Sequence, residues 1–206
     1  MRKMFEIGGL IAAAALIAFG IGAIVLGVTG RSEVRSNLSR EAIVGTPDMT
    51  PKTIAAEAKQ AGLKNVDLPS CSVAGKPIDT GARAKCFASY MRIHALEATG
   101  GQTYAQMGRY LDAAGKPTND ETQAAKDPKS GQPVENGLRQ VWVTETALGT
   151  ALNTSFMAER LSIFGIVVGV ALLLAGFGFA ILAVGGALRN PSTALKFARR
   201  PAGSTA

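Results

Sequence analysis

The residues best suited to chemistry lie in the stretch CFASYMRIHALEATGG, Cys86 to Gly101, which contains the single histidine of the chain. If this stretch is helical, His94 and Glu97 share a face, because side chains three positions apart are neighbours on a helix. Cys86 precedes His94 by eight residues, slightly more than two helical turns. These residue types at this spacing suggest either a metal site or a cysteine nucleophile with a histidine base.

The composition argues against both kinds of chemistry. Zinc and non-haem iron sites use three or four protein ligands, typically several His or Cys with a carboxylate, whereas the 206 residues include one His and two Cys. A cysteine nucleophile needs a free thiolate and a base, and Cys86 is better used in a disulfide. We therefore predict no catalytic, cofactor-binding or metal-binding residue and no cofactor. If His94 and Glu97 do more than pack, we expect a pH-sensitive contact, because histidine titrates near neutral pH.

The two cysteines, Cys71 and Cys86, both lie in the long segment between two apolar runs. An even pair of cysteines in an extracytoplasmic segment most simply forms one disulfide. Closing a ring of about 15 residues adds roughly 3 kcal/mol of stability in the chain-entropy model, which helps a small domain with a thin core. The cysteine usage therefore predicts a disulfide-clamped domain outside the cytoplasm.

Two uncharged runs are long enough to cross a membrane. They cover 23 positions, Ile7 to Thr29, and 28 positions, Leu161 to Leu188. As a helix, the shorter run reaches about 35 Å, more than the roughly 30 Å of a hydrocarbon core. Lipid offers the backbone no hydrogen-bond partner, so both runs are expected to be helical. The first run is too long for a signal peptide and lacks a small-x-small cleavage site after it, so we expect an uncleaved anchor.

The basic residues near the two runs predict the orientation. Six lie on the side of the chain ends: Arg2, Lys3, Arg189, Lys196, Arg199 and Arg200. Four lie at the ends of the connecting segment: Arg31, Arg35, Arg40 and Arg160. Because lysine and arginine accumulate on the cytoplasmic side, both termini are expected in the cytoplasm. The predicted layout is a cytoplasmic N-terminal tail at 1–6, transmembrane helices at 7–29 and 161–188, an extracytoplasmic domain at 30–160 and a basic cytoplasmic tail at 189–206.

The net charge of +7 does not indicate a nucleic-acid partner. The segment 30–160 contains 16 basic and 14 acidic residues, so most of the excess lies in the terminal tails. Basic residues beside a membrane favour orientation and contact with anionic lipid. The expected partner is therefore the lipid bilayer, with no nucleic acid.

The connecting segment is predicted to be mainly helical. Thr50 and Pro51 are suited to begin a helix that ends before Gly62. A second helix is expected from about Thr80 to Gly100, with an inward stripe formed by Phe87, Tyr90, Met91, His94 and Ala98. The polar stretch 113–137 is predicted to be a mobile loop. From Leu138 a single helix of about 50 residues is expected to continue through the second apolar run.

Small residues in the apolar runs predict close helix packing. In the second run, Gly165 and Gly169 are separated by one helical turn, as are Ala14, Ala18 and Gly22 in the first. Such small-xxx-small steps let helix backbones approach closely. They favour packing of the two helices on each other, in a homo-oligomer, or on another membrane protein. Neither run contains a charged residue, which argues against a proton or ion pathway within this chain alone.

Several stretches resemble a family of actinobacterial two-span membrane proteins of unknown function. The resemblance rests on MRKMFEIGGLIAAAALIAFGIGAIVLGVTGR, GTPDMTPKTIAAEAKQAGL, CSVAGKPIDTGARAKCFASYMRIHALEATGGQTYAQMGR, PVENGLRQVWVTETALGTALNTSFMAERLSIFGIVVGVALLL and GGALR. Members often have an automatic label as aromatic ring-opening dioxygenases. Ring opening by non-haem iron requires a ligand set such as two His and a carboxylate, and only His94 is present. The resemblance implies a plasma-membrane location and nothing catalytic.

The expected fold class is mainly α, with two transmembrane helices flanking a small helical, disulfide-clamped extracytoplasmic domain. The expected function is that of a non-enzymatic plasma-membrane protein, which presents this domain as a scaffold, sensor or accessory subunit in the cell envelope. The first alternative is an accessory subunit of a transport or respiratory membrane complex. The second is a ring-opening dioxygenase or hydrolase centred on His94.

Overall fold

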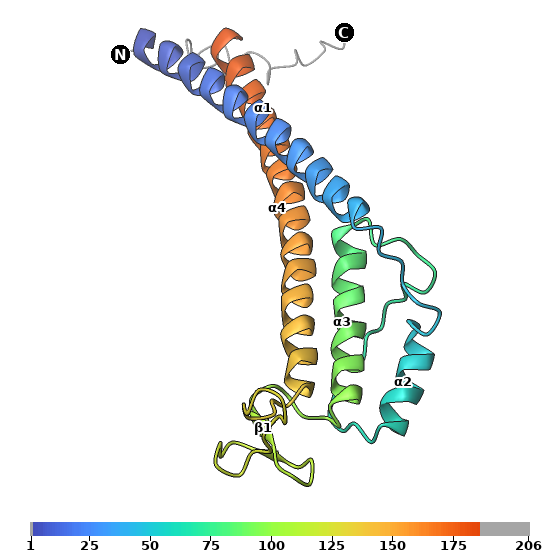
Figure 1. Ribbon diagram of the computed structural model, residues 1–206. Coiled ribbons are helices and arrows are strands. Elements are labelled where there is room, and N and C mark those ends of the chain that lie inside the picture. Colours follow the sequence, from blue (N-terminus) through green and yellow to red (C-terminus); the bar gives the residue numbers. More distant parts are fainter. Residues whose placement is uncertain (1, 186–206) are drawn as a thin grey trace, which may run out of the picture. The chain divides into compact units, whose positions relative to one another are not determined.

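The computed structural model describes residues 2–185 and is mainly helical (Figure 1). Its elements are helices α1 (Arg2–Arg40), α2 (Pro51–Gln60), α3 (Gly81–Ala98) and α4 (Leu138–Val184), and strands β1 (Tyr110–Leu111) and β2 (Pro117–Thr118). Two compact units share the two long helices. The terminal unit comprises residues 2–32 and 160–185, and the central unit comprises Glu33–Glu159. The predicted helical fold with a disulfide in the central segment is confirmed; the predicted C-terminal tail, 189–206, lies outside the described residues.

In the terminal unit, α1 and α4 pack through small residues spaced seven apart. On α1, a Cβ atom added at Gly27 falls 2.6 Å from the carbonyl oxygen of Ser162, and one added at Gly20 falls 2.9 Å from that of Gly169. One added at Gly176 falls 3.2 Å from the carbonyl oxygen of Ala13. As the α1 position advances by seven the α4 position falls by seven, so the two helices are antiparallel. A seven-residue spacing keeps one seam of each helix facing its neighbour.

This seam contains some of the small residues predicted to pack closely and not others. Gly169 lies in it, and a Cβ at Gly165 falls 3.6 Å from the carbonyl oxygen of Ala23. Ala14, Ala18 and Gly22 lie on the exposed side of α1, and a Cβ at Gly22 meets nothing within 4 Å. The prediction followed steps of four residues, whereas the helix pair uses steps of seven.

The two long helices are long and apolar enough to cross a membrane. In the most apolar 18-residue stretch of each helix, only 17% of residues are buried. Large apolar side chains therefore cover the outside of the pair; Leu26 is 75% exposed and Leu174 is 69% exposed. A helix inside a soluble protein core would have these side chains covered.

The central unit is built on two helices with clear end signals. The Thr50 hydroxyl caps α2 by accepting a hydrogen bond from the Thr53 amide at 3.2 Å, with Pro51 at the first helical position. The Thr80 hydroxyl caps α3 in the same way, accepting from the Arg83 amide at 3.3 Å. After α3, Gly100 adopts a φ of +62°, which glycine permits without a steric penalty. Both predicted helices are therefore present, α2 with its expected N-cap Thr50 and α3 beginning next to Thr80 as predicted.

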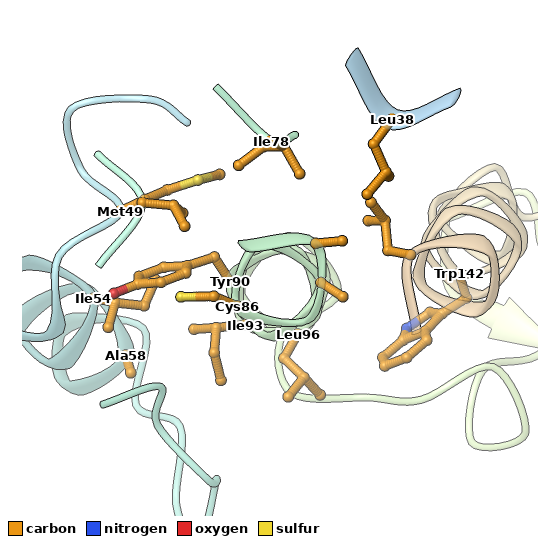
Figure 2. Close-up of a cluster of buried hydrophobic side chains, with 14 of the residues drawn as sticks. Leu38, Met49, Ile54, Ala58, Ile78, Cys86, Tyr90, Ile93, Leu96 and Trp142 are labelled. Atoms are coloured by element: carbon orange, nitrogen blue, oxygen red, sulfur yellow. The ribbon is translucent and has the colours of Figure 1, made fainter. Parts of the chain in front are cut away.

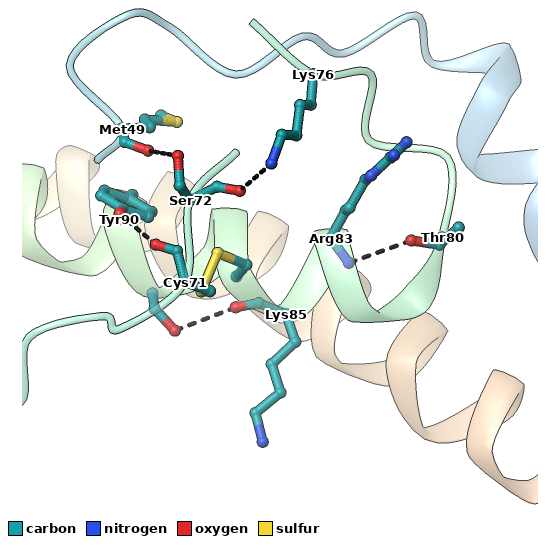
Figure 3. Close-up of a disulfide and its surroundings, with 10 residues drawn as sticks. Met49, Cys71, Ser72, Lys76, Thr80, Arg83, Lys85 and Tyr90 are labelled. Atoms are coloured by element: carbon teal, nitrogen blue, oxygen red, sulfur yellow. Dashed lines mark hydrogen bonds between the residues drawn. A yellow bond between two sulfur atoms is a disulfide. The ribbon is translucent and has the colours of Figure 1, made fainter. Parts of the chain in front are cut away.

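The disulfide joins the loop after α2 to the first half of α3. Cys71 and Cys86 are bonded, with their Cα atoms 6.1 Å apart (Figure 3). The hydroxyl of Tyr90, one turn further along α3, donates a 2.6 Å hydrogen bond to the Cys71 carbonyl oxygen. The loop is therefore attached to α3 by a covalent bond and by a polar contact.

Helix α3 is buried on two sides rather than along one stripe. Figure 2 shows Tyr90, Cys86 and Ile93 directed toward Met49, Ile54 and Ala58, whereas Leu96 lies on the side of Trp142. Of the predicted inward stripe, Tyr90 is fully buried, Phe87, Met91 and His94 are partly buried, and Ala98 is exposed. The prediction assumed one packing partner, but the α3 helix lies between α2 and the first part of α4 (Figure 1).

The stretch 113–137, predicted as a mobile loop, consists mostly of turns and bends joined by short backbone pairings. Strands β1 and β2 are antiparallel, and isolated bridges join Asp112 to Ala124 and Lys126 to Pro133. The side chain of Asp127 caps a turn by accepting from the amides of Lys129 and Ser130. Polar side chains make these turn contacts. The prediction of a loop relied on the low apolar content of the stretch, which does not indicate such contacts.

Candidate functional site

The single histidine lies between carboxylates from two segments. Its Nε2 atom is 3.2 Å from Oδ2 of Asp48, which lies in the loop before α2. Its Nδ1 atom is 3.7 Å from Oε2 of Glu97, one turn further along α3. The predicted neighbourhood of His94 and Glu97 is present, and the shorter contact is to Asp48. The His94 and Asp48 side chains are 33% and 32% exposed, so this cluster is open to solvent on one side.

A third carboxylate, that of Glu57 on α2, lies close to His94 and Asp48. A ligand atom of each of Asp48, Glu57 and His94 lies within 4.8 Å of the other two. Oε2 of Glu57 is inaccessible to solvent and has no hydrogen-bond partner, the one such side-chain atom found among the described residues. Burying a carboxylate oxygen without a partner is unfavourable. We call the set Asp48, Glu57 and His94 the α2–α3 cluster.

Local contacts favour the charged form of Asp48. A hydrogen bond from the Thr46 side chain holds the pKa of Asp48 below its usual value of 3.8, against the opposing effect of burial, and His94 adds a smaller lowering effect. Burial raises the pKa of the neighbouring Tyr90 above its usual value of 10.0, and the charge of Asp48 adds to this. At neutral pH the carboxylate of Asp48 is therefore ionised, and the neighbouring phenol of Tyr90 is neutral.

Both ring nitrogens of His94 face carboxylate oxygens, and the contact of Nε2 with Asp48 is the shorter of the two. A carboxylate near one ring nitrogen favours the proton on that nitrogen, which leaves the lone pair on the other. Glu97 faces Nδ1, whereas Asp48 faces Nε2. The nearer carboxylate is Asp48, so this geometry favours a proton on Nε2 that is donated to Asp48. A cation bound at Nε2 would require this proton to move to Nδ1, beside Glu97.

Sequence reasoning missed Asp48 and Glu57. Asp48 lies 46 positions before His94, and Glu57 lies 37 positions before it, so neither spacing has local meaning. The available signal was in α2, where Glu57 lies next to the buried Ala58 and three positions after the buried Ile54. A carboxylate beside the apolar stripe of a short helix indicates a partner across the helix interface.

The cysteine chemistry considered from the sequence does not occur in this structure. Both cysteines are in the disulfide, and there is no free cysteine. Cys86 is therefore unable to act as a nucleophile with His94 as its base. The α2–α3 cluster also differs from the two-histidine, one-carboxylate set of ring-opening non-haem iron enzymes, because it supplies one imidazole and two carboxylates.

Two other buried carboxylates lie on α4. Glu159 accepts from Arg35 Nε at 2.9 Å and from the Gly81 amide at 2.7 Å, so it is used in packing. Glu145 lines a groove of about 480 Å³ between α3 and α4, together with His94, Met91 and Val141. The groove is mostly apolar. Glu145 lies near the side of α3 that faces away from α2.

No protein-family model, curated protein or solved structure matches the chain. The features of the chain that bear on function are therefore the two apolar helices, the disulfide and the α2–α3 cluster. The resemblance to the actinobacterial two-span family remains a prediction.

Proposed function

We propose that the protein is an integral plasma-membrane protein that presents the central unit outside the cytoplasm, as a non-enzymatic scaffold, sensor or accessory subunit of the cell envelope. In this proposal, α1 and α4 cross the bilayer as an antiparallel pair. The loops, α2, α3 and the β pairing then lie on the outer side, and both ends of the chain face the cytoplasm.

The observation that supports this proposal is the exposure of apolar side chains around the helix pair. Phe19 is 73% exposed and Ile181 is 71% exposed, and neither has a covering element in the described chain. Soluble proteins rarely expose apolar surface on this scale. Lipid tails cover such side chains, and a helix satisfies its own backbone groups in a bilayer.

The first helix is better explained as a retained anchor than as a signal peptide. The α1 helix continues without a break to Arg40, and its Leu38 is part of the buried core of the central unit. Gly20 and Gly27 on the same helix are in close contact with α4. Cleavage after the apolar run would remove the packing partner of the α4 seam, so the structure favours an intact α1.

The disulfide supports an outer location for the central unit. Disulfides persist in oxidising compartments and are rare in the cytosol. Cys71 and Cys86 both lie in the central unit. If α1 and α4 each cross the membrane once, the central unit lies on the opposite side of the membrane from the two chain ends. The basic residues of the sequence flanks favour the cytoplasm for those ends.

A second candidate function, a subunit of a larger membrane complex, is supported by one further observation. Ala14, Ala18 and Gly22 form a small-residue face on α1 that is exposed in this chain. Small residues in a transmembrane helix allow another helix to approach closely. This face is suited to a helix of a partner protein or of a second copy.

The two candidates are tested together by purification in mild detergent after cross-linking in the native membrane. The scaffold or subunit roles predict a stoichiometric membrane-protein partner, and Gly22→Leu is expected to reduce its recovery. Gly178→Leu is the matched control, because Gly178 also meets nothing within 4 Å but lies on α4 rather than on the Ala14–Gly22 face. Release of the protein from membranes by alkaline carbonate would contradict an integral membrane protein.

A further inference from the structure

We propose that the α2–α3 cluster, Asp48, Glu57 and His94, binds a divalent transition-metal cation of the Zn²⁺ class. Its three side chains come from the loop before α2, from α2 and from α3. The site goes beyond the proposed membrane role, since its geometry lies within the central unit and does not depend on the side of the membrane. It also differs from the His94 and Glu97 pair suggested by the sequence, because Glu97 serves as a neighbour of His94 rather than as a ligand.

The donor atoms are near the separation that a metal requires. Tetrahedral Zn²⁺ with ligands at 2.0–2.2 Å places its donor atoms about 3.3–3.6 Å apart. The three donor atoms of the cluster lie within 4.8 Å of one another. Nε2 of His94 and Oδ2 of Asp48 are already 3.2 Å apart. Glu57 lies within 4.8 Å of both other donors, so it needs to move by at most about 1.5 Å, which its side-chain torsions allow.

An independent observation is the unpartnered oxygen of Glu57. Its Oε2 atom is buried and makes no hydrogen bond within the described chain. His94 does not supply the missing partner, because its Nε2 faces Asp48 and its Nδ1 faces Glu97. Among the described side chains, none of the lysine or arginine ion pairs involves these carboxylates. A cation held between the three side chains would satisfy this oxygen.

The surroundings of His94 have the arrangement found around metal-binding histidines. Such a histidine usually directs its second nitrogen to a carboxylate, which fixes the ring and makes the ligand nitrogen more basic. Glu97 is the carboxylate nearest this position, with its Oε2 atom 3.7 Å from Nδ1, slightly beyond hydrogen-bond distance. Part of the cluster is open to solvent, with His94 and Asp48 about one-third exposed, so a cation can enter and retain a water ligand.

The donor types select the class of metal. Imidazole nitrogen favours Zn²⁺ and its neighbours over Mg²⁺ and Ca²⁺, which prefer oxygen ligands alone. Neither cysteine is available as a soft ligand, because both are in the disulfide. A bound cation would join α2 and its preceding loop to α3, and would reduce the freedom of α2.

The test is zinc binding by the full chain in detergent, after removal of metals with a chelator. We expect about one Zn²⁺ per chain in equilibrium dialysis, and an increase in melting temperature on addition of ZnCl₂ but not of MgCl₂. Asp48→Asn, Glu57→Gln and His94→Gln should each weaken zinc binding by about tenfold or more, and Glu97→Gln should weaken it by a smaller factor. The matched control is Asp67→Asn, an exposed carboxylate in the same unit that should leave zinc binding unchanged.

Folding of the variants is checked without metal. Glu57→Gln replaces a carboxylate of which one buried oxygen has no partner, so its melting temperature in chelator should equal or exceed that of the wild type. A variant that keeps this temperature and the disulfide but loses zinc binding supports the site. Zinc bound equally by all variants, or no stoichiometric zinc in the wild type, would overturn the proposal while leaving the membrane role intact.

Discussion

The carboxylate of Glu159 on α4 accepts a 2.7 Å hydrogen bond from the backbone amide of Gly81, the first residue of α3. The first amides of a helix have no partner within the helix, and a negative charge there is favourable. The other oxygen of Glu159 accepts from Arg35 Nε of α1 at 2.9 Å. One side chain therefore connects the three helices α1, α3 and α4 of the central unit.

Replacing Glu159 with alanine should destabilise the central unit by about 2–3 kcal/mol, because it removes hydrogen bonds to a buried charge. Arg35→Ala should lower the free energy of unfolding by less than Glu159→Ala does. The Arg35 side chain is 44% exposed, so loss of its ion pair with Glu159 has a smaller effect. The free energy of unfolding is measured in denaturant through the fluorescence of Trp142, the single tryptophan. Glu135→Ala, at an exposed site, is the control. Equal effects of Glu159→Ala and Glu135→Ala would show that the three-helix connection is unimportant.

Loss of the disulfide should lower the stability of the central unit by about 3 kcal/mol, because Cys71 and Cys86 close a ring with a sequence separation of 15. The measurement compares unfolding of the wild type with that of the Cys71→Ser, Cys86→Ser double variant. Reduction of the wild type should give the same loss, while the double variant should not respond to reductant. A reductant effect on the double variant would show that the loss comes from somewhere other than this bond.

A large side chain at Gly27 should separate the helix pair, because its Cβ would lie 2.6 Å from the Ser162 carbonyl oxygen. Overpacking of this kind typically costs about 1–3 kcal/mol. We expect Gly27→Leu to lower the temperature at which the detergent-solubilised protein loses its monodisperse elution. Gly22→Leu is the matched control within the same helix, since no atom lies within 4 Å of its Cβ. Greater damage from Gly22→Leu than from Gly27→Leu would contradict the observed seam.

Alkaline pH should destabilise the central unit through Tyr90. Burial raises the pKa of folded Tyr90 above the unfolded value of 10.0, and the charge of Asp48 raises it further. The folded chain therefore holds the phenol proton more tightly than the unfolded chain does. This contribution is fully present below pH 10.0 and is lost as the pH rises through the folded pKa.

The check is urea unfolding from about pH 8 to pH 11, compared between variants. Tyr90→Phe should be less stable at neutral pH by about 1 kcal/mol, because it lacks the hydrogen bond to Cys71. Its stability should also fall less steeply above pH 10 than that of the wild type. Tyr104→Phe, at an exposed position, should keep the wild-type slope. Parallel curves for Tyr90→Phe and the wild type would refute the assignment.

Features determined by neighbouring residues were predictable from the sequence. The N-caps at Thr50 and Thr80 depend on a hydroxyl reaching an amide three positions later, and both are present. The apolar runs predicted helices, and α4 begins at Leu138, well before its apolar run, as the uninterrupted pattern indicated. The cysteine pair left one possible intramolecular bond, and Cys71 and Cys86 form it.

Features determined by distant residues were missed. The approach of Glu57 to His94 depends on how α2 packs on α3, and no local spacing encodes that interface. Ala14, Ala18 and Gly22 match a packing motif but lie outside the seam between α1 and α4, because the register between two helices decides which face is used; their packing on a partner stays a prediction. Helix α3 is buried on two sides because three helices meet there, which a single-stripe pattern does not predict.

The most direct test of the membrane proposal is labelling of lysines in intact cells with an amine reagent that does not cross membranes, followed by mass spectrometry. Lys52, Lys59 and Lys64 are exposed in the central unit and should be labelled in intact cells. Lys3 and Lys196, in the basic sequence flanks, should be labelled only after the cells are permeabilised. Labelling of Lys3 and Lys196 in intact cells, with Lys52, Lys59 and Lys64 protected, would contradict the proposed topology.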